Sequence, residues 1–231
     1  MLLYQPIDGY CYNSDSLFLY DFISSFSPKG RVLDIGAGSG VLGLLVARDF
    51  AKVELEAIEK QEVFVTLAQR NAKINKIDYS LHVGDFLDFN DSKGFDYIIS
   101  NPPFYHDGAT KSSNDVKSIA RSNSHLPIKE FIKKVAKLLK TKAHFIFCYD
   151  AKQLTFLIAE LEANKLRVND VQFVHSKRDR SASIVMIHAR KNSNALTNIL
   201  EPFFSFEDNE VSKNAQRIYD KARTHTIKCQ I

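Results

Sequence analysis

Two short stretches of this sequence combine residue types that can do chemistry. In DIGAGSG, Asp34 stands just before three glycines, which let the backbone turn sharply and bring its N–H groups close to a ligand. The glycines are Gly36, Gly38 and Gly40. NPPF, from Asn101 to Phe104, joins an amide to two prolines and an aromatic ring. A turn alone needs one proline at most and rarely a large aromatic, so this stretch predicts a functional loop.

The elements that position these stretches are predicted by apolar patterns. Strands are expected at Arg31–Ile35, Val53–Ile58, Tyr79–Val83, Phe95–Ser100, Ala143–Tyr149, Arg167–His175 and Ser183–Ala189. Helices are expected at Val41–Phe50, Glu62–Ile74, Pro127–Leu139 and Ala151–Ala163. This alternation predicts an α/β fold, a Rossmann-like, doubly wound, mostly parallel seven-stranded sheet with a C-terminal antiparallel hairpin strand. The long polar stretch between Phe104 and Leu126 is expected to be a lid, a binding loop or a disordered segment.

Acidic residues lie at the ends of three of these strands. Asp34 lies at the end of the first, Glu59 closes the second, and Asp85 follows the third. Ligands of open α/β sheets bind at the carboxyl ends of the strands, so these acids are expected to face one crevice. Glu59 is expected to accept hydrogen bonds from ribose hydroxyls and Asp85 from an adenine amino group. The ring of Phe86 is expected to lie against the adenine.

The charge of Asp34 helps to choose between two cofactors. GSGVLG, at 38–43, also fits the G-x-G-x-x-G pattern of NAD-binding proteins. In that pattern the first glycine follows the strand directly and the loop binds a pyrophosphate, whereas here an acid and an earlier glycine intervene. A carboxylate repels phosphates but suits a ligand with an ammonium group. S-adenosylmethionine carries an ammonium and a sulfonium and no phosphate, so it is the expected cofactor.

NPPF has the groups that methylation of an exocyclic amine on a planar ring requires. The lone pair of such a nitrogen is delocalised into the ring, and hydrogen-bond acceptors for its two hydrogens return density to it. Asn101 offers its side-chain oxygen, and Pro103 forces Pro102 into an extended conformation that leaves a backbone carbonyl free as a second acceptor. Phe104 offers a flat face on which a base can stack. These four residues are the expected catalytic group.

Composition excludes several other classes of protein. The chain is 45% hydrophobic and 25% charged, which is typical of globular proteins, and no apolar run approaches the roughly 20 residues of a membrane span. No signal peptide is recognised at the N-terminus. Cys11, Cys148 and Cys229 lack paired spacing, so neither a metal site nor a disulfide framework is expected, and the cytoplasm is the expected location.

Charge is distributed unevenly along the chain. Residues 1–100 contain 9 Lys and Arg against 14 Asp and Glu, and residues 101–231 contain 22 against 13. The net charges of −5 and +9 give the overall +4. Lysine-rich solvated helix faces would account for part of this excess, but a positive second half also predicts contact with a polyanion such as nucleic acid.

These residues together resemble a known family. DIGAGSG, Glu59, Asp85 and NPPF, in this order, are similar to the class I S-adenosylmethionine-dependent methyltransferases with an [N/D]PP[Y/F] motif. The resemblance is closest to the bacterial tRNA1(Val) adenine-N6 methyltransferases, on account of Tyr105, Ala120-Arg121 and the basic segment VHSKRDR that ends at Arg180. Asn13-Ser-Asp15-Ser16 is similar to the segment that starts that family's first helix.

The resemblance implies methylation of adenine N6 in tRNA, near the anticodon of a valine tRNA, with the base flipped out onto the NPPF motif. It implies that tRNA is held by Tyr105 and by basic residues of the second half. These are Arg121, Lys177, Arg178, Arg180 and Lys191. The expected organisation is an N-terminal cap segment at 1–30, a methyltransferase domain at 31–190 and a basic C-terminal extension at 191–231.

Several alternatives share the same chemistry. Release-factor glutamine-N5 methyltransferases also carry NPPY, but they have a helical substrate domain for which the roughly thirty residues before Val32 leave little room. Ribosomal RNA guanine-N2 enzymes share NPPF and often carry an extra N-terminal domain, and DNA adenine methyltransferases usually carry a target-recognition domain. A non-catalytic RNA-binding module with the same fold is a further alternative of a different class.

Overall fold

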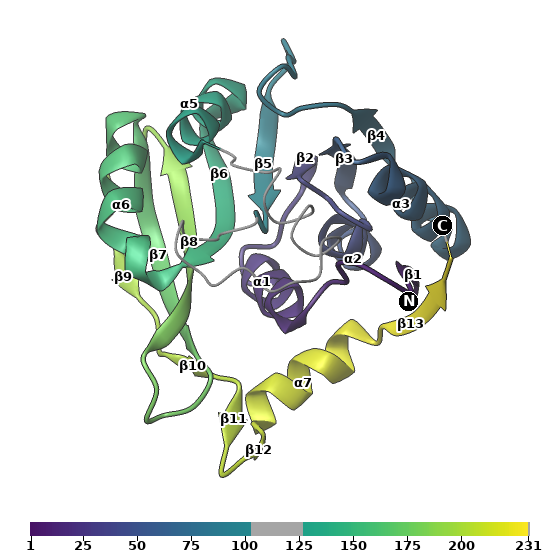
Figure 1. The fold of residues 1–231 in the computed structure, drawn as a ribbon. Helices are drawn as coiled ribbons and strands as arrows, with labels where there is room; N and C mark the ends of the chain where they lie inside the picture. Colours follow the sequence, from purple (N-terminus) through teal and green to yellow (C-terminus); the bar gives the residue numbers. More distant parts are fainter. Residues whose placement is uncertain (103–126, 231) are drawn as a thin grey trace.

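The computed structural model describes residues 1–102 and 127–230 (Figure 1). Its helices are α1 (Ser14–Ser24), α2 (Val41–Asp49), α3 (Glu62–Asn75), α5 (Ile128–Leu138), α6 (Leu154–Ala163) and α7 (Lys213–Ala222), and η1 (Ala151–Gln153) is a 3₁₀ turn. The long strands are β1 (Leu2–Pro6), β2 (Gly30–Ile35), β3 (Val53–Glu59), β4 (Ser80–Val83), β5 (Phe95–Ser100), β6 (Leu139–Asp150), β7 (Leu166–His175), β8 (Ala182–Lys191) and β13 (His225–Cys229). The short strands are β9 (Asn198–Ile199), β10 (Phe203–Phe204), β11 (Phe206–Glu207) and β12 (Glu210–Val211).

One large sheet organises the chain. Its order is β10-β7-β8-β6-β5-β2-β3-β4, with β9 beside β7. The strands from β4 through β3, β2 and β5 to β6 are parallel, and β8 runs antiparallel to both β6 and β7. The predicted seven-stranded sheet and its antiparallel hairpin strand are therefore confirmed, and two-residue strands extend it at the β7 edge.

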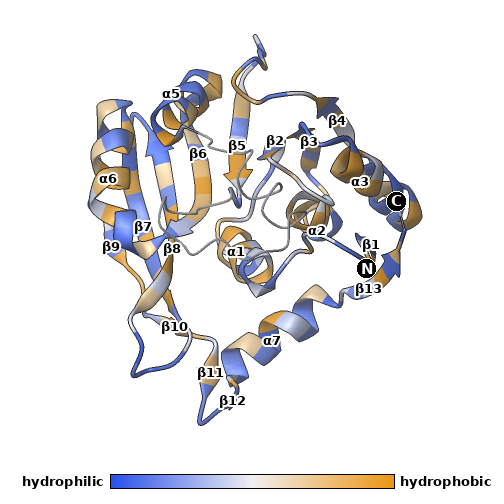
Figure 2. Ribbon diagram, in the orientation of Figure 1, coloured by the Kyte–Doolittle hydropathy of each residue, from blue (hydrophilic) through white to orange (hydrophobic). Residues whose placement is uncertain are grey.

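Helices cover both faces of this sheet, and each face has its own apolar core. One core joins α1, α2 and α7 to the sheet, and the other is formed with α5 and α6. The amphipathic α5 illustrates how sequence sets the layer, because Phe131, Ile132, Val135 and Leu138 are buried while its lysines point away. Figure 2 shows hydrophobic colour concentrated in β6 and at the end of β5, while α3 and α5 carry both colours.

The two ends of the chain pair with each other. β1 and β13 form a separate two-stranded parallel sheet, in which Leu2 lies opposite His225 and Pro6 opposite Cys229 (Figure 1). Before it reaches β13, the C-terminal segment adds β9 and β10 to the edge of the large sheet, and α7 then packs on α1. The segments expected as an N-terminal cap and a C-terminal extension are thus joined in one structure.

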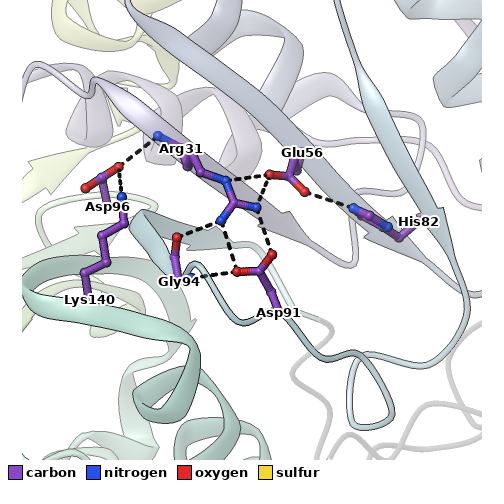
Figure 3. A network of polar contacts seen from close by, with 7 residues as sticks. All are labelled: Arg31, Glu56, His82, Asp91, Gly94, Asp96 and Lys140. Atoms are coloured by element: carbon purple, nitrogen blue, oxygen red, sulfur yellow. Dashed lines mark hydrogen bonds and ion pairs between the residues drawn. The ribbon is translucent and has the colours of Figure 1, made fainter.

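A network of charged groups lies near the amino ends of the parallel strands (Figure 3). The guanidinium of Arg31 on β2 donates to Glu56 at 2.5 and 3.0 Å and to both oxygens of Asp91 at 2.9 and 3.0 Å. It also donates to the carbonyl of Gly94 at 2.9 Å. Hydrogen bonds from Arg31 lower the pKa of Asp91 to about 2. This network ties β2, β3 and the loop before β5 together, away from the acids expected to bind the cofactor.

Candidate active site

Asp34 is the penultimate residue of β2 and lies beneath the glycine loop, almost fully buried. Its side chain is 1% exposed, and its Oδ2 accepts a hydrogen bond of 2.9 Å from the backbone N–H of Gly43 in α2. Burial raises the pKa of Asp34 to about 7, and the nearby charge of Glu59 adds to the rise, while the bond from Gly43 opposes it. A Cβ on Gly43 would lie 2.9 Å from that same oxygen, so only glycine leaves room for the carboxylate.

The glycine loop has the backbone conformation that glycine alone adopts easily. Gly36, Gly38 and Gly40 have φ values of 67°, 56° and 84°, in the left-handed region. A Cβ added at Gly36 or Gly38 would meet nothing within 4 Å, so the space over these two residues is open. At Gly40 it would press on Leu44 and Ala68, which shows that this third glycine serves packing between α2 and α3 as well.

Glu59 connects the end of β3 to this loop. Its Oε2 accepts a 2.9 Å hydrogen bond from the N–H of Gly38, and its Oε1 accepts from the N–H groups of Lys60 and Gln61 at 2.9 and 2.8 Å. The carboxylate is 6% exposed. Glu59 therefore lies beside the glycines, as expected, and its contact with ribose hydroxyls stays a prediction.

Two further side chains support the loop from β1 and α3. Gln5 donates to the hydroxyl of Ser39 at 2.6 Å, and Asn71 donates to the carbonyl of Ser39 at 2.9 Å. Asn71 also accepts from the N–H of Tyr4 at 2.6 Å, which joins β1 to α3. Both amides are buried, at 1% and 0% exposure. Neither amide was predicted as a site residue from the sequence, although a glutamine within the apolar run at 2–6 was a possible signal.

Asp85 and Phe86 point in different directions beyond the end of β4. Asp85 is half-exposed, accepts from the N–H of Leu87 at 2.9 Å and lies 3.8 Å from the ammonium of Lys60. The ring of Phe86 is buried in the core, with its centroid 5.3 Å from that of Phe131. The prediction that the ring of Phe86 lies against the adenine is therefore wrong, and the ring packs in the core instead. Successive side chains here alternate between solvent and core, so Asp85 and Phe86 point to different sides.

Asn101 directly follows β5, at the same end of the parallel strands as Asp34 and Glu59, and its side chain lies between two polar partners. Its Nδ2 donates to Ser16 Oγ at 2.9 Å, and its Oδ1 accepts from Cys148 Sγ at 2.9 Å. Ser16 lies in the first turn of α1 and Cys148 near the carboxyl end of β6, and both are buried. Pro102 is also buried. The contact between Cys148 and Asn101 was not predicted from the sequence.

Four expected site residues lie outside the described part of the chain. They are Pro103, Phe104, Tyr105 and Arg121. Their roles in stacking the base and holding the substrate therefore remain predictions, as does the expected lid between residues 104 and 126.

The basic residues of the hairpin turn lie at the same edge of the sheet as Asn101. β8 runs antiparallel to β6 with Ile184 opposite Asp150, so the turn before β8 projects from the carboxyl end of β6. Arg178 contacts Glu207 at 3.4 Å and lies 4.8 Å from the ring centre of Phe204, and Lys177 donates to Asn209. Arg180 is exposed beside Asp179.

Lys191 does not join this group. It is the last residue of β8, at the end of the strand far from the turn, where its ammonium donates to the carbonyl of Leu139 at 2.7 Å. Burial lowers the pKa of Lys191. The prediction that Lys191 binds phosphates beside Lys177, Arg178 and Arg180 is therefore wrong. Lys191 lies at one end of β8, and the other three residues lie in the turn before its other end.

Neither a metal site nor a membrane span is found in the described residues. Within 1–102 and 127–230, no group of three or more His, Cys, Asp or Glu side chains could hold a metal ion. No helix in these ranges is long and apolar enough to cross a membrane.

Comparison with known proteins agrees with this geometry. The chain is 28% identical over 161 residues to a tRNA1(Val) (adenine(37)-N6)-methyltransferase of Shewanella woodyi, which covers 66% of this chain and 65% of that protein. It is 26% identical to the protein of the same name from Pedobacter heparinus, over 73% of this chain and 72% of the relative. It is 36% identical over 103 residues to ribosomal RNA small subunit methyltransferase C of Salmonella arizonae, which covers 43% of this chain but 29% of the relative.

The fold is shared with solved structures of low sequence identity. A predicted O-methyltransferase from Agrobacterium tumefaciens superposes with a TM-score of 0.69 at 14% identity, over 93% of this chain and 99% of that one. A putative RNA methyltransferase from Pyrococcus horikoshii gives a TM-score of 0.58 at 18% identity, over 80% and 93%. The methyltransferase small domain family matches residues 13–145, which include the glycine loop, Glu59, Asp85 and the NPPF motif. The predicted resemblance to methyltransferases is confirmed, and the chain belongs to the methyltransferase small domain family.

Proposed function

We propose that this protein transfers a methyl group from S-adenosylmethionine to N6 of an adenine in tRNA, near the anticodon of a valine tRNA. The observation that carries the proposal is the place of Asn101, at the carboxyl end of β5, next to the strand ends that bear Asp34 and Glu59. The relatives named for this reaction support the choice of base and of RNA. An RNA substrate and three free cysteines both fit a cytoplasmic reaction.

The residues at these strand ends fit S-adenosylmethionine. The open space over Gly36 and Gly38 leaves room for a ligand against the loop. Asp34 would favour the ammonium group of this ligand, and Glu59 and the exposed Asp85 would accept hydrogen bonds from its ribose and adenine. When bound, the cofactor supplies an electrophilic methyl group. Burial and the charge of Glu59 raise the pKa of Asp34, and among the described residues no cation appears that opposes this rise.

Asn101 would orient and activate the amine of the substrate. Its Oδ1 has two lone pairs, and accepting an N–H of the amine returns electron density to the nitrogen. The same contact aligns the nitrogen with the methyl group, so the amide contributes by positioning as well as by electrostatics. No strong base is needed, because the methylated amine is acidic and loses its proton to water. In this proposal Phe104 stacks on the flipped base.

The hairpin turn would bind the RNA backbone. Lys177, Arg178 and Arg180 project from the carboxyl edge of the sheet, on the side of β6. Phosphate contacts from exposed Lys and Arg position a nucleic acid without reading its sequence. The choice of nucleotide would then depend on the pocket around Asn101.

A second candidate is methylation of guanine N2 in ribosomal RNA. It is favoured by the 36% identity over 103 residues to ribosomal RNA small subunit methyltransferase C. Guanine N2 is also an exocyclic amine with a delocalised lone pair, so Asn101 would act on it in the same way.

The substrate is tested with S-adenosylmethionine labelled on its methyl group. The protein is incubated with total tRNA and ribosomal RNA from a strain that lacks the gene, and with DNA and a release factor. Digestion of the products is expected to yield labelled N6-methyladenosine from tRNA alone. Labelled N2-methylguanosine from ribosomal RNA would support the second candidate, and label in a release-factor glutamine would overturn an RNA substrate.

Single substitutions distinguish the proposed role of Asn101 in binding the substrate from that of Glu59 in binding the cofactor. Asn101→Ala is expected to lower turnover by about 100-fold or more while the cofactor Kd changes little, since its bonds go to the substrate amine. Asn101→Asp is the matched control, because it keeps an acceptor at the same position. Glu59→Gln is expected to weaken the cofactor instead. Equal losses of rate and cofactor affinity in Asn101→Ala would refute the role of its amide.

A further inference from the structure

The amide of Asn101 has two chemically different ends, and the structure gives them different partners. Oδ1 lies 2.9 Å from Cys148 Sγ, and Nδ2 lies 2.9 Å from Ser16 Oγ. We propose that Cys148 is a positioning residue that fixes which end of the amide faces the substrate. This inference rests on the proposed function of Asn101 in binding the substrate amine.

Ser16 alone does not determine the orientation of the amide. A hydroxyl can donate or accept, so it could pair equally well with Nδ2 or with Oδ1. A rotation of the amide by half a turn would exchange its oxygen and nitrogen and still leave Ser16 with a partner.

Cys148 removes this ambiguity. A protonated thiol is a weak donor and a weak acceptor, and opposite an amide it pairs best with the carbonyl oxygen. Burial and then the nearby charge of Asp15 raise the pKa of the Cys148 thiol well above its usual value, so it keeps its proton. The side chain is 1% exposed and water does not compete for the bond. The thiol therefore holds Oδ1 on the side of β6 and Nδ2 on the side of α1.

The orientation of the amide decides whether it can assist an amine. With Oδ1 in the observed place, the thiol uses one lone pair and the second is available for the N–H of the substrate. In the rotated amide, an NH₂ group would face the NH₂ of the base, and two donors would meet without an acceptor. Cys148 thus acts through Asn101, and no covalent step involves its sulfur.

The alternative explanation is that Cys148 only fills space. It lies in β6 opposite Met186 of β8 and belongs to the core that joins α1 and α2 to the sheet. A space-filling role predicts that size alone matters at this position. A positioning role predicts that a donor matters, which a pair of variants of similar size can separate.

The experiment compares Cys148→Ala, which has no donor, with Cys148→Ser, whose hydroxyl donates. Steady-state kinetics are measured with the RNA that the wild type methylates, together with the cofactor Kd and the melting temperature. Cys148→Ala is expected to lower kcat by about 3- to 10-fold with the cofactor Kd unchanged, and Cys148→Ser to restore kcat to within about twofold of the wild type. Cys11→Ala, at a cysteine without contact to Asn101, is the matched control and is expected to keep the wild-type kcat.

Three outcomes would overturn the proposal. They are unchanged kcat in Cys148→Ala, equal losses of kcat in both variants, and an undiminished effect of Cys148→Ala in an Asn101→Ala background. The last comparison is a double-mutant cycle, in which coupled residues do not add.

A measurement without turnover keeps this inference separate from the proposed function. If the wild type methylates none of the candidate substrates, the proposed function fails, but the side-chain NH₂ of Asn101 can still be observed by NMR in protein labelled with ¹⁵N. One set of NH₂ resonances is expected in the wild type and in Cys148→Ser, and a shifted or second set in Cys148→Ala. Identical Asn101 resonances in all three proteins would refute the positioning role.

Discussion

Replacing Asp34 by asparagine should stabilise the ligand-free protein and weaken its cofactor binding. Asp34 is a buried carboxyl whose pKa is raised to about 7, against an ordinary value of 3.8. The folded state therefore holds a proton between these pH values that the unfolded state releases. The contribution of Asp34 to the free energy of unfolding is fully present below pH 3.8 and is lost as the pH rises through 7. An asparagine keeps the acceptor for Gly43 and carries no charge at any pH.

The size of the effect follows from the pKa shift. A rise of about three units corresponds to about 4 kcal/mol at pH 8, which is an upper limit for one buried group. The gap in unfolding free energy between Asp34→Asn and the wild type should shrink to below about 1 kcal/mol at pH 4. At about 2–4 °C per kcal/mol, this upper limit corresponds to a melting temperature at most about 8–16 °C higher for the variant at pH 8. Asp88→Asn, at an exposed carboxylate, should show no comparable gap.

The assay is thermal unfolding from pH 4 to 8, followed by calorimetric titration with S-adenosylmethionine and S-adenosylhomocysteine. The wild type should bind both ligands more tightly as pH rises from 6 to 7.5 and Asp34 loses its proton, whereas Asp34→Asn should bind both weakly and without this dependence. S-adenosylhomocysteine keeps the ammonium and lacks the sulfonium, so equal losses for the two ligands would assign the contact to the ammonium. A variant that is less stable than the wild type at pH 8, or a gap that does not depend on pH, would refute the reasoning.

Three further substitutions test other parts of the structure. Gly43→Ala should place a methyl group 2.9 Å from an oxygen of Asp34 and cost about 1–3 kcal/mol of stability, measured by urea unfolding, with a weaker cofactor Kd. Arg31→Met should remove the guanidinium that pairs with Glu56 and Asp91 and cost about 3 kcal/mol, whereas an unchanged unfolding midpoint would contradict the role of this network. Ending the chain at Thr224 should remove the partner of β1 and weaken cofactor binding several-fold in titration, since β1 supports the glycine loop, and an unchanged Kd would show that the loop stands alone.

Much of the central sheet could be predicted because its elements are defined locally. The apolar runs of β2, β3, β5 and β6 and the helical spacing of α2 and α5 lie within short windows, so their periodicity is visible in sequence. β1 and β13 were not predicted, because each is short and has its partner almost a whole chain away. α7 was also missed, since most of its residues are polar and only Ala215, Ile218 and Ala222 are buried.

Part of the candidate site could likewise be predicted from the sequence, and part could not. Asp34, Glu59 and Asn101 could be placed at one edge because parallel strands share their carboxyl ends. The contacts of Asn101 with Ser16 and Cys148 could not be predicted, since they depend on how α1 packs on the sheet and on the pairing of β6 with β5. Phe86 was assigned to the ligand because the sequence gives the order of side chains and not the face of the loop to which each one points.

The pairing of β1 with β13 has a consequence for the synthesis of the protein. Leu2–Pro6 are synthesised before the other described elements, and His225–Cys229 only after all of them. Until then β1, whose Gln5 supports the cofactor loop through Ser39, is an unpaired edge strand. The parallel strands of the large sheet can pair before β13 is made, but the cofactor loop gains the support of a paired β1 only after His225–Cys229 have been synthesised. Full binding of the cofactor is therefore expected only in chains that contain β13, so that a product truncated before His225 does not compete for substrate with chains that contain it.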